Sequence, residues 1–405
     1  MIIEEPFTAS RRPIWLKITC FILILGASIP TTLYLRKHIK HTDQQDRILV
    51  VSRGYEGCSD DSPRCAVVNS TAKPLFIINP FASNDDLLKR FKLSFENVPE
   101  VLHHTCSVVW KNSMLMFGGS VYAGPHEVTM LTGCKVKHFE QALPLLVSKA
   151  IYGFRGVCTT VQDKVMLCFG TRYNLRQCHQ FEIDLIGKNI TINSFKMLTE
   201  SLFSHDDGTK ITSINGCLIL VDTKNDISDI MFAVGGGGYD AYHNKAETYN
   251  VSSFRWEQRP NYPFSEHITE YAILPVGNEF IIFGGVDYSN CRIILCTKLS
   301  TIAGFNPFKN TWRRLGKLKS PRYGHTVIRL SGQFIIIGGY YQAATKLNHS
   351  IESYTFNEDA SDPEIEFSFE KFVPIELRQS FEVMTVPSSY TDKCDPPIIA
   401  DTEST

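Results

Sequence analysis

Histidine is the side chain in this sequence with the widest chemistry, since it can ligate a metal ion or carry a proton near neutral pH. Six histidines near predicted strand ends are candidates for a shared site: His103, His104, His205, His243, His267 and His325. Histidine is common at strand ends without being a ligand, and one sequence cannot show convergence. No Cys-x-x-Cys pair occurs, so the paired-ligand zinc patterns are absent. We therefore predict no catalytic residues, no metal site and no cofactor.

Two short motifs look like functional loops but lack residues that such loops need. Gly235-Gly236-Gly237-Gly238 is followed neither by Gly-Lys-Ser/Thr nor by a helical pattern, as a phosphate-binding loop requires. Ser204-His205-Asp206-Asp207-Gly208 resembles the start of the sialidase Asp box, but Lys210 and Ile211 stand where its Thr-Trp ending belongs. Both segments are interpreted as turns.

Composition narrows the function classes before any fold is considered. The chain of 405 residues has 41 Lys and Arg against 42 Asp and Glu, a net charge of -1, which gives a nucleic-acid surface no support. With 43% hydrophobic and 11% aromatic residues it can bury a sizeable core, which excludes disorder for most of its length. The 26 glycines favour β structure with many turns.

The elements that position these residues recur along the chain. Apolar runs ending in a glycine doublet occupy 114–119, 280–285 and 334–339, and 165–170 is a degenerate copy with a single glycine. First glycines are 52 residues apart from 118 to 170, 49 from 235 to 284 and 54 from 284 to 338. Each run follows a shorter apolar strand and a polar turn, so the unit is a β-hairpin. The glycines with a structural role are Gly118, Gly119, Gly170, Gly235, Gly236, Gly284, Gly285, Gly338 and Gly339.

The third unit is irregular. Ile211–Ile214 and Cys217–Val221 read as a hairpin in the same register, but no doublet follows it. A further strand, Ile230–Val234, does reach Gly235, so we interpret 223–229 as part of an insertion that extends to about residue 234. An incorrect gene model would produce the same pattern.

Aromatic residues mark the second half of two units. Tyr249 and Phe305 each stand seven residues before a tryptophan, Trp256 and Trp312. Ring pairs at this spacing are expected on the two outer strands of one sheet, packed against the next sheet.

Taken together, the doublet after an apolar strand, the aromatic-Asn pair and the later tryptophan resemble the kelch repeat. The resemblance covers about 47–394 and implies an all-β propeller of four-stranded blades, which we expect to number six, with seven as the alternative. Phe381–Val386 would supply the last inner strand, and Arg47–Val51 with Lys73–Ile78 would pair with it to close the ring.

The resemblance also implies a function. Kelch propellers without a catalytic site bind a protein partner through their loops, and this is the expected, non-enzymatic role, with no nucleic acid involved. One alternative is an intracellular adaptor, such as a ubiquitin-ligase substrate receptor. A second, less favoured, is a copper enzyme similar to galactose oxidase. The partner, the binding face and the oligomeric state are left open.

The N-terminal region is expected to carry a membrane segment. Residues 18–35 contain no formal charge and span roughly 27 Å as a helix, which fits a signal-anchor or, over its stronger first part, a cleaved signal peptide. The tail 1–17 precedes it, the linker 36–46 follows it, and 395–405 forms the C-terminal tail. The basic residues slightly favour a cytosolic body, since those after the segment are at least as dense.

Sequons and cysteines favour the other orientation. Candidate N-glycosylation sites are Asn69, Asn189, Asn250 and Asn348, and 11 of the 12 cysteines follow the apolar segment. Candidate disulfides are Cys58–Cys65, Cys168–Cys178 and Cys291–Cys296, although Cys106 and Cys158 fit plain core packing equally well. The expectation is a single-pass membrane protein with a luminal or extracellular propeller, or a secreted protein.

Overall fold

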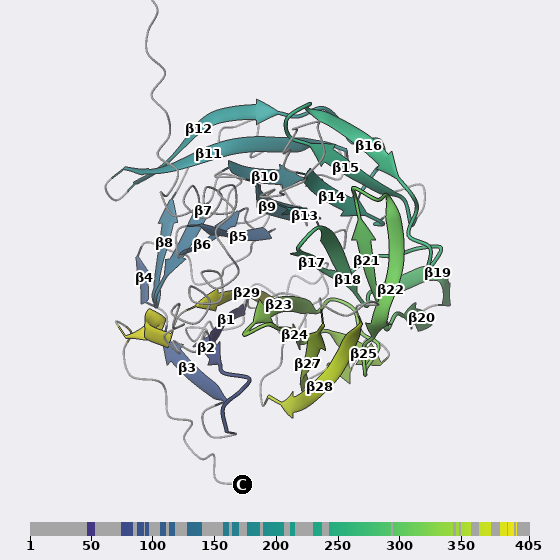
Figure 1. Ribbon diagram of the computed structural model, residues 1–405. Helices are drawn as coiled ribbons and strands as arrows, with labels where there is room; N and C mark the ends of the chain where they lie inside the picture. The colour runs from purple at the N-terminus through teal and green to yellow at the C-terminus, as the bar shows by residue number, and fades with distance from the viewer. Residues whose placement is uncertain are drawn as a thin grey trace, which may run out of the picture. The chain divides into compact units, whose positions relative to one another are not determined.

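Antiparallel strands account for nearly all of the structure, which is a computed structural model (Figure 1). The described residues are 47–52, 74–83, 87–92, 94–96, 106–110, 113–117, 128–139, 157–161, 164–169, 176–186, 189–205, 211–214, 230–236, 243–292, 295–342, 346–347, 350–357, 364–373, 381–386, 388–392 and 394. They belong to one compact unit, 46–405. The expected segments 1–17, 18–35, 36–46 and 395–405 lie outside the described residues.

Six large sheets stand side by side, and we name them in chain order. Sheet I contains β5 (Cys106–Trp110), β6 (Ser113–Phe117), β7 (Val128–Thr132), β8 (Lys135–Phe139) and, parallel to β8, β4 (Ser94–Glu96). Sheet II contains β9 (Val157–Val161), β10 (Lys164–Cys168), β11 (Cys178–Ile186) and β12 (Asn189–Met197). Sheet III contains β13 (Ile211–Ile214), β14 (Ile230–Val234), β15 (Ala246–Asn250) and β16 (Arg255–Arg259).

The second half of the chain repeats the pattern and adds two small hairpins. Sheet IV contains β17 (Ala272–Val276), β18 (Glu279–Phe283), β21 (Thr301–Asn306) and β22 (Thr311–Lys317). Sheet V contains β23 (Thr326–Leu330), β24 (Gln333–Ile337), β27 (Ser350–Phe356) and β28 (Ile365–Phe372). The hairpins are β19 (Val286–Arg292) with β20 (Leu295–Lys298), and β25 (Tyr340–Gln342) with β26 (Lys346–Leu347).

A closing sheet joins the two ends of the unit. It has the order β29 (Phe381–Val386), β1 (Arg47–Ser52), β2 (Pro74–Ile78), β3 (Leu88–Lys92), and Figure 1 shows β29 beside β1. The predicted pairing of the two terminal segments is confirmed, because Arg47 lies opposite Val386 and Ser52 opposite Phe381.

The fold is an all-β propeller, as expected, but the blade count needs correction. Five sheets have the four strands of a regular blade, whereas six or seven such blades were expected. Sheet I has five strands instead of four, because the short strand β4 pairs in parallel with the outer strand β8.

Hydrophobic clusters fill the junctions between neighbouring sheets. Phe117 of sheet I meets Phe181 of sheet II with ring centroids 5.5 Å apart, and Phe232 of sheet III stacks on Phe280 of sheet IV at 4.7 Å. Further clusters join II to III, IV to V, V to the closing sheet, and the closing sheet to I. The second strand of each of sheets I to V is packed on both faces; β14, for example, is buried along its whole length. This explains why the second strands read as continuous apolar runs rather than alternating ones.

The glycine doublet is explained by backbone contacts at the junctions. We call the stretch of chain that leads into the first strand of a sheet the entry segment of that sheet. A Cβ on Gly284 would lie 2.7 Å from the carbonyl oxygen of Arg322, in the entry segment of the next sheet. A Cβ on Gly285 would lie 2.9 Å from the carbonyl oxygen of Thr269, in the entry segment of its own sheet. Both glycines have positive φ, 57° and 108°. At this junction the doublet thus sits where two entry segments contact one strand end, and a Cβ at either position would come too close to their carbonyl oxygens.

Sheet II shows a variation that the sequence pattern concealed. Cys168 pairs with Val157, so the first doublet position belongs to Phe169 and not to Gly170, which we had taken as the first glycine. Phe169 has φ 58°, and its N–H donates to Gln177 O at 2.9 Å, as Gly284 N–H donates to Thr301 O at 3.0 Å. Gly170 itself lies outside the described residues, as do Gly118 and Gly119.

Sheet III corrects the interpretation of the irregular unit. The partner of β13 is β14, with Ile211 opposite Ala233, and not the segment 217–221. Ile230–Val234 is therefore the second strand of a regular sheet and no part of an insertion. The extra residues are 215–229, which lie outside the described part of the chain.

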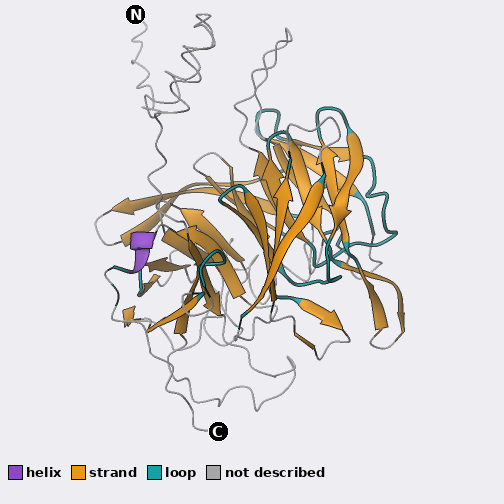
Figure 2. Cartoon of the chain, turned by 60° about the horizontal axis from the view of Figure 1, so that its bottom comes forward, coloured by secondary structure: helices purple, strands orange, loops and turns teal. Residues whose placement is uncertain are grey.

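A second, covalent closure follows β29. The short 3₁₀ helix η3 (Ser388–Thr391; purple in Figure 2) leads to Cys394, which forms a disulfide with Cys134 in the turn between β7 and β8. Tyr390 packs on the hydrophobic cluster between the closing sheet and sheet I, and its hydroxyl donates to Leu131 O at 3.5 Å. Sequence analysis had not proposed this pair, because its members are 260 residues apart.

The membrane prediction is corrected here. Among the described residues there is no helix with the length and apolar character to cross a bilayer. The segment 18–35 is outside those residues. The predicted single-pass membrane localisation therefore has no support in the structure.

Two glycines provide a matched test of the junction geometry. Gly339 (φ 85°) would place a Cβ 2.6 Å from Tyr323 O, whereas Gly332 (φ 78°) has nothing within 4 Å. We expect Gly332→Ala to cost about 1–2 kcal/mol of unfolding free energy, from the left-handed backbone alone. Gly339→Ala is expected to cost roughly 1–3 kcal/mol more, because an entry segment must move. Urea denaturation measures both, and equal losses would contradict this account of the doublet.

Candidate functional site

The two ends of the sheets differ in what they display. Because consecutive strands are antiparallel, the connections from second to third strand and from one sheet to the next all leave at one end, which we call the loop face. Its described segments are 198–205, 243–245, 260–271, 284–292, 295–300, 318–325 and 338–342. The opposite end, the turn face, has tight turns at 251–254, 277–278, 307–310 and 331–332. Of the described connections, the longer ones therefore lie on the loop face.

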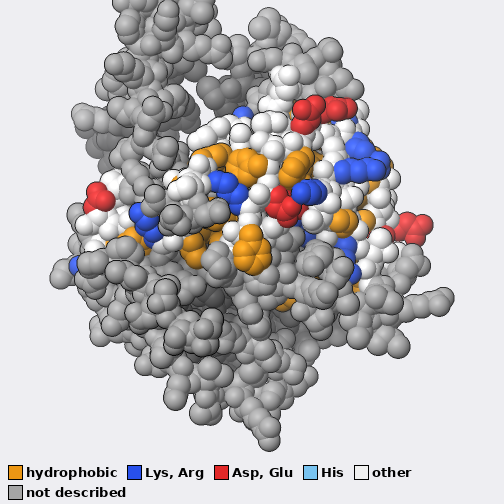
Figure 3. All heavy atoms as spheres, turned by 90° about the horizontal axis from the view of Figure 1, so that it is seen from below, with side chains coloured by type: hydrophobic (Ala, Val, Ile, Leu, Met, Phe, Trp, Pro, Cys, Tyr) orange, Lys and Arg blue, Asp and Glu red, His pale blue; other side chains and the backbone are white. Residues whose placement is uncertain are grey.

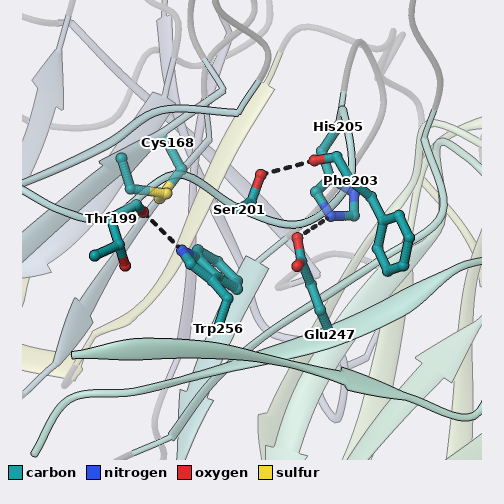
Figure 4. The surroundings of a disulfide bond; sticks show 8 residues. Cys168, Thr199, Ser201, Phe203, His205, Glu247 and Trp256 are labelled. Carbon is teal, nitrogen blue, oxygen red and sulfur yellow. Dashed lines mark hydrogen bonds and ion pairs between the residues drawn. A yellow bond between two sulfur atoms is a disulfide. The ribbon is translucent and has the colours of Figure 1, made fainter. Parts of the chain in front are cut away.

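The junction of sheets II and III contains a fully buried acid–histidine pair (Figure 4). His205 Nε2 lies 2.6 Å from Glu247 Oε1, and its Nδ1–H donates to Gly235 O at 2.8 Å. The second oxygen of Glu247 accepts from Leu202 N–H at 2.9 Å. The pair therefore fixes the entry segment 201–205 to β15.

Sheet V holds its entry segment with an arginine at the corresponding place. Arg322 donates to Glu352 and to Gly338 O, the latter at 3.2 Å. Glu352 and Glu247 hold equivalent places, since each is the second residue of its third strand to pair with the second strand. Tyr354 donates to the other Glu352 oxygen, and burial raises the pKa of this tyrosine, which keeps it a donor. Arg322 and Glu352 are both fully buried. At the II–III junction, His205 bonds to the same two kinds of partner, a glutamate and the carbonyl oxygen of the first glycine.

The II–III junction is also braced by a disulfide. Cys168 and Cys178 lie opposite each other on β10 and β11 and are bonded, which is the second of the three predicted pairs. The bond closes the connection that begins at Phe169, whose ring lies 4.7 Å from that of His205. Cys158 and Cys296 are also disulfide-bonded. The side chains of Cys58, Cys65, Cys106 and Cys291 are outside the described part.

A serine, a histidine and an aspartate meet at the next junction, but they cannot act as a catalytic triad. Ser265 Oγ lies 2.5 Å from Asp287 Oδ2 and 2.7 Å from the His267 backbone oxygen, while His267 Nδ1 is 3.7 Å from Asp287 Oδ1. Burial alone would raise the pKa of Asp287, but hydrogen bonds from Ser265 and Ser289 outweigh it and lower the pKa. The serine is bonded to the acid rather than to the base, so no nucleophile is activated.

The other histidine and glycine hypotheses can be checked in part. No group of three or more His, Cys, Asp or Glu is placed to hold a metal in the residues that the structure covers, which exclude His103 and His104. Gly235 N–H donates to Lys245 O and Gly236 N–H to Ile268 O, so neither is directed at a phosphate. Of the Asp-box segment, only Ser204 and His205 are described.

The four marked aromatic residues lie inside the sheets. Tyr249 is opposite Trp256 and Phe305 opposite Trp312 on neighbouring strands. Each tryptophan donates its indole N–H to an incoming connection, Trp256 to Thr199 O at 2.9 Å and Trp312 to Pro260 O at 2.8 Å. They hold the outer strands to the loop-face connections.

The sequon at Asn250 has a structural explanation. Asn250 Oδ1 accepts from Ser252 N and Ser253 N, both at 2.9 Å, which caps the turn between β15 and β16. Asn306 caps the equivalent turn of sheet IV in the same way, although Pro307 excludes a sequon there. The side chains of Asn69, Asn189 and Asn348 are outside the described part, so their glycosylation stays a prediction.

Two curated proteins match part of the chain. It is 23% identical over 199 residues to "Kelch repeat and BTB domain-containing protein 2" of Ectromelia virus (strain Moscow), and 22% identical over 199 residues to the protein of the same name from Cowpox virus (strain Brighton Red). The chain resembles the kelch-repeat propellers. The match covers 49% of this chain and 31% of each relative. No family model matches it.

His243, on the loop face, is a titratable group whose effect on stability can be measured. His243 Nε2–H donates to Ser204 O at 2.8 Å and its Nδ1 accepts from Lys245 N at 3.3 Å, so the neutral ring is fully bonded. Burial, with His205, Lys245 and His267 nearby, lowers the pKa of His243 to about 4.

We therefore expect stability to fall as the pH drops from about 6.5 towards 4, because the unfolded chain binds the proton and the native chain does not. His243→Gln should remove about 1–2 kcal/mol of that loss, allowing for its exposed part. Urea denaturation at pH 7.5 and pH 4.5 measures it, and an unchanged pH dependence in the variant would contradict the assignment.

Proposed function

We propose that this kelch-like propeller is a non-enzymatic binding protein that holds a protein partner on its loop face. The supporting observation is that the two added hairpins, β19–β20 and β25–β26, both extend the loop face, whereas the described turns 251–254, 277–278, 307–310 and 331–332 of the turn face are tight. Rigid sheets that present variable connections are the usual arrangement of a binding site.

The surface seen in Figure 3 is a weaker candidate for the binding site than the loop face. Its hydrophobic side chains are separated by basic and acidic ones in the described part. On the outer strand β28, Phe367 is 43% exposed and lies beneath Lys319, whose Nζ is 4.8 Å from the ring centroid. Lys319 is itself paired with Glu370.

We propose further that sheet I is a sixth blade. It has a regular antiparallel series β5–β8, and it shares clusters with sheet II and with the closing sheet. On this interpretation β4 is an addition to a normal blade.

A matched pair of substitutions tests the binding face. Leu202 on the loop face and Phe308 on the turn face are both 45% exposed. Because a new carboxylate in a binding surface costs desolvation energy, Leu202→Glu should weaken partner binding at least about tenfold, and Phe308→Glu should leave it unchanged. Proteins cross-linked to the wild-type chain in its cell of origin are identified by mass spectrometry, and their affinities for the three chains are then compared.

The control outcomes are distinct. Loss of binding in Phe308→Glu with retention in Leu202→Glu would place the partner on the turn face. Equal binding by all three chains would contradict a loop-face site.

For the compartment, we propose secretion or another oxidising environment, because Cys134–Cys394, Cys168–Cys178 and the bonded Cys158 and Cys296 are all oxidised in the structure. The alternative is an intracellular kelch adaptor, which is favoured by the BTB domain in the names of the viral relatives.

Thiol mapping decides between the two. Protein isolated from its natural source is alkylated at once and digested without reductant. A peptide linking 134 to 394 and another linking 168 to 178 are expected. Complete alkylation of all four cysteines would contradict the oxidising compartment and favour the adaptor.

A further inference from the structure

The entry segment of sheet III presents two neighbouring apolar side chains on the loop face. Leu202 is 45% exposed, and Phe203 is partly exposed. They stand three and two residues before His205, whose place in sheet V is taken by Arg322. The residues at the same distances before that arginine are polar: Lys319 and Ser320. The apolar pair is therefore a feature of sheet III and not a requirement of every entry segment.

Hydrogen bonds within the protein hold this pair in a fixed place. Ser201 Oγ donates to Phe203 O at 2.7 Å (Figure 4), and Arg176 Nε–H donates to Ser201 O at 2.6 Å. The N–H of Leu202 donates to the buried Glu247 at 2.9 Å. The backbone is thus ordered before any partner arrives, which reduces the entropy lost when these side chains are covered.

A lysine without an acidic partner lies beside the apolar pair. Lys245 is exposed, and its Nζ stands 4.7 Å from the centroid of the Phe203 ring. Across the described residues it forms no ion pair, whereas Lys319 of sheet V is paired with Glu370. The nearby Glu247 is no substitute, because its oxygens accept from the Leu202 N–H and lie against His205. The loop face therefore carries a positive charge next to exposed apolar surface.

We propose that Leu202, Phe203 and Lys245 form a subsite for a segment of the protein partner in which an acidic residue adjoins a large apolar one. A carboxylate would bind the ammonium through charge-assisted hydrogen bonds, and an apolar side chain would remove the leucine and phenylalanine from water. The ring contact already holds the ammonium in place, so less freedom is lost on binding. The subsite rests on the proposed function, because it supplies the chemistry by which the loop face selects its partner.

Peptide binding tests the charge preference. The probes are two immobilised libraries of octapeptides that are neutral at all other positions, one with Leu-Glu at the centre and one with Leu-Gln. Wild-type protein should bind the Leu-Glu library roughly two- to fivefold better, which is the effect of one exposed ion pair. The preference should disappear at about 1 M NaCl, because salt screens such a pair.

The chain offers a matched control for the lysine. Lys196 is also exposed, and its Nζ stands 3.5 Å from the centroid of the Phe254 ring. Lys245→Gln should reduce the Leu-Glu preference to near unity, and Lys196→Gln should leave it intact. Lys245→Glu should reverse the preference in favour of a third library with Leu-Lys at the centre. Undiminished preference in Lys245→Gln, or equal loss in both glutamine variants, would overturn the proposal.

Stability provides the second readout. Lys245→Gln and Lys196→Gln each lose one contact between an ammonium and a ring, so they should unfold at similar urea concentrations. A much lower urea midpoint in Lys245→Gln would assign this lysine a structural role on the Phe203 ring and overturn the proposal.

These outcomes are independent of the loop-face test. If Leu202→Glu loses the natural partner while Lys245→Gln keeps the wild-type peptide preference, the proposed function stands and the subsite falls. If Lys245→Gln loses the preference while Leu202→Glu and Phe308→Glu bind the natural partner as the wild type does, the subsite stands as a peptide site and the loop-face function falls.

Discussion

A main-chain hydrogen bond ties sheet III to sheet IV and sheet IV to sheet V, and the geometry of these two junctions depends on it. The N–H of the second glycine donates to the entry segment of the following sheet, Gly236 to Ile268 O at 2.8 Å and Gly285 to Arg322 O at 2.9 Å. A Cβ on Gly284 would lie 2.7 Å from the Arg322 oxygen and one on Gly285 2.9 Å from the Thr269 oxygen, and both residues have positive φ, which is why glycine occupies both places at this junction. The hydrogen bond also sets the separation of the sheets, and the large side chains of the junction clusters fill the wedge that widens away from it.

Equivalent junction positions hold quite different chemistry. Arg322 and Glu352 form a buried ion pair in sheet V, whereas Ile268 and Ala303 stand at the matching places of sheet IV, inside a hydrophobic cluster. Replacing a buried ion pair with packed apolar side chains is often neutral for stability, so one chain can use both solutions. The His205–Glu247 pair is a third solution.

The features that sequence analysis predicted are those written within a short stretch of chain. The hairpins, the doublets of sheets III to V, the opposed aromatic pairs and the Cys168–Cys178 bond all join residues at most about a dozen positions apart, where turn chemistry and alternation act directly. The pairing of the terminal segments was also predictable, since a ring of sheets must cover its edges.

The features that sequence analysis missed arise from packing between segments far apart in the sequence, which no local pattern records. The role of Phe169 was hidden because the adjacent Gly170 was interpreted as the first glycine of the unit. The second strand of sheet III was misassigned because the residues 217–221 are as apolar as β14. His205 and Glu247 are 42 residues apart and come together only once β15 lies under the entry segment.

The bond between Cys134 and Cys394 has a topological consequence. Its two cysteines are 260 residues apart in the sequence, and sheets II to V lie between them. A single backbone cut in any of the exposed connections within that span leaves both fragments covalently attached, and the clusters on either side of the cut keep them in register. Proteolytic nicking there would change the gel pattern under reducing conditions and leave the intact mass, apart from one added water, as it was.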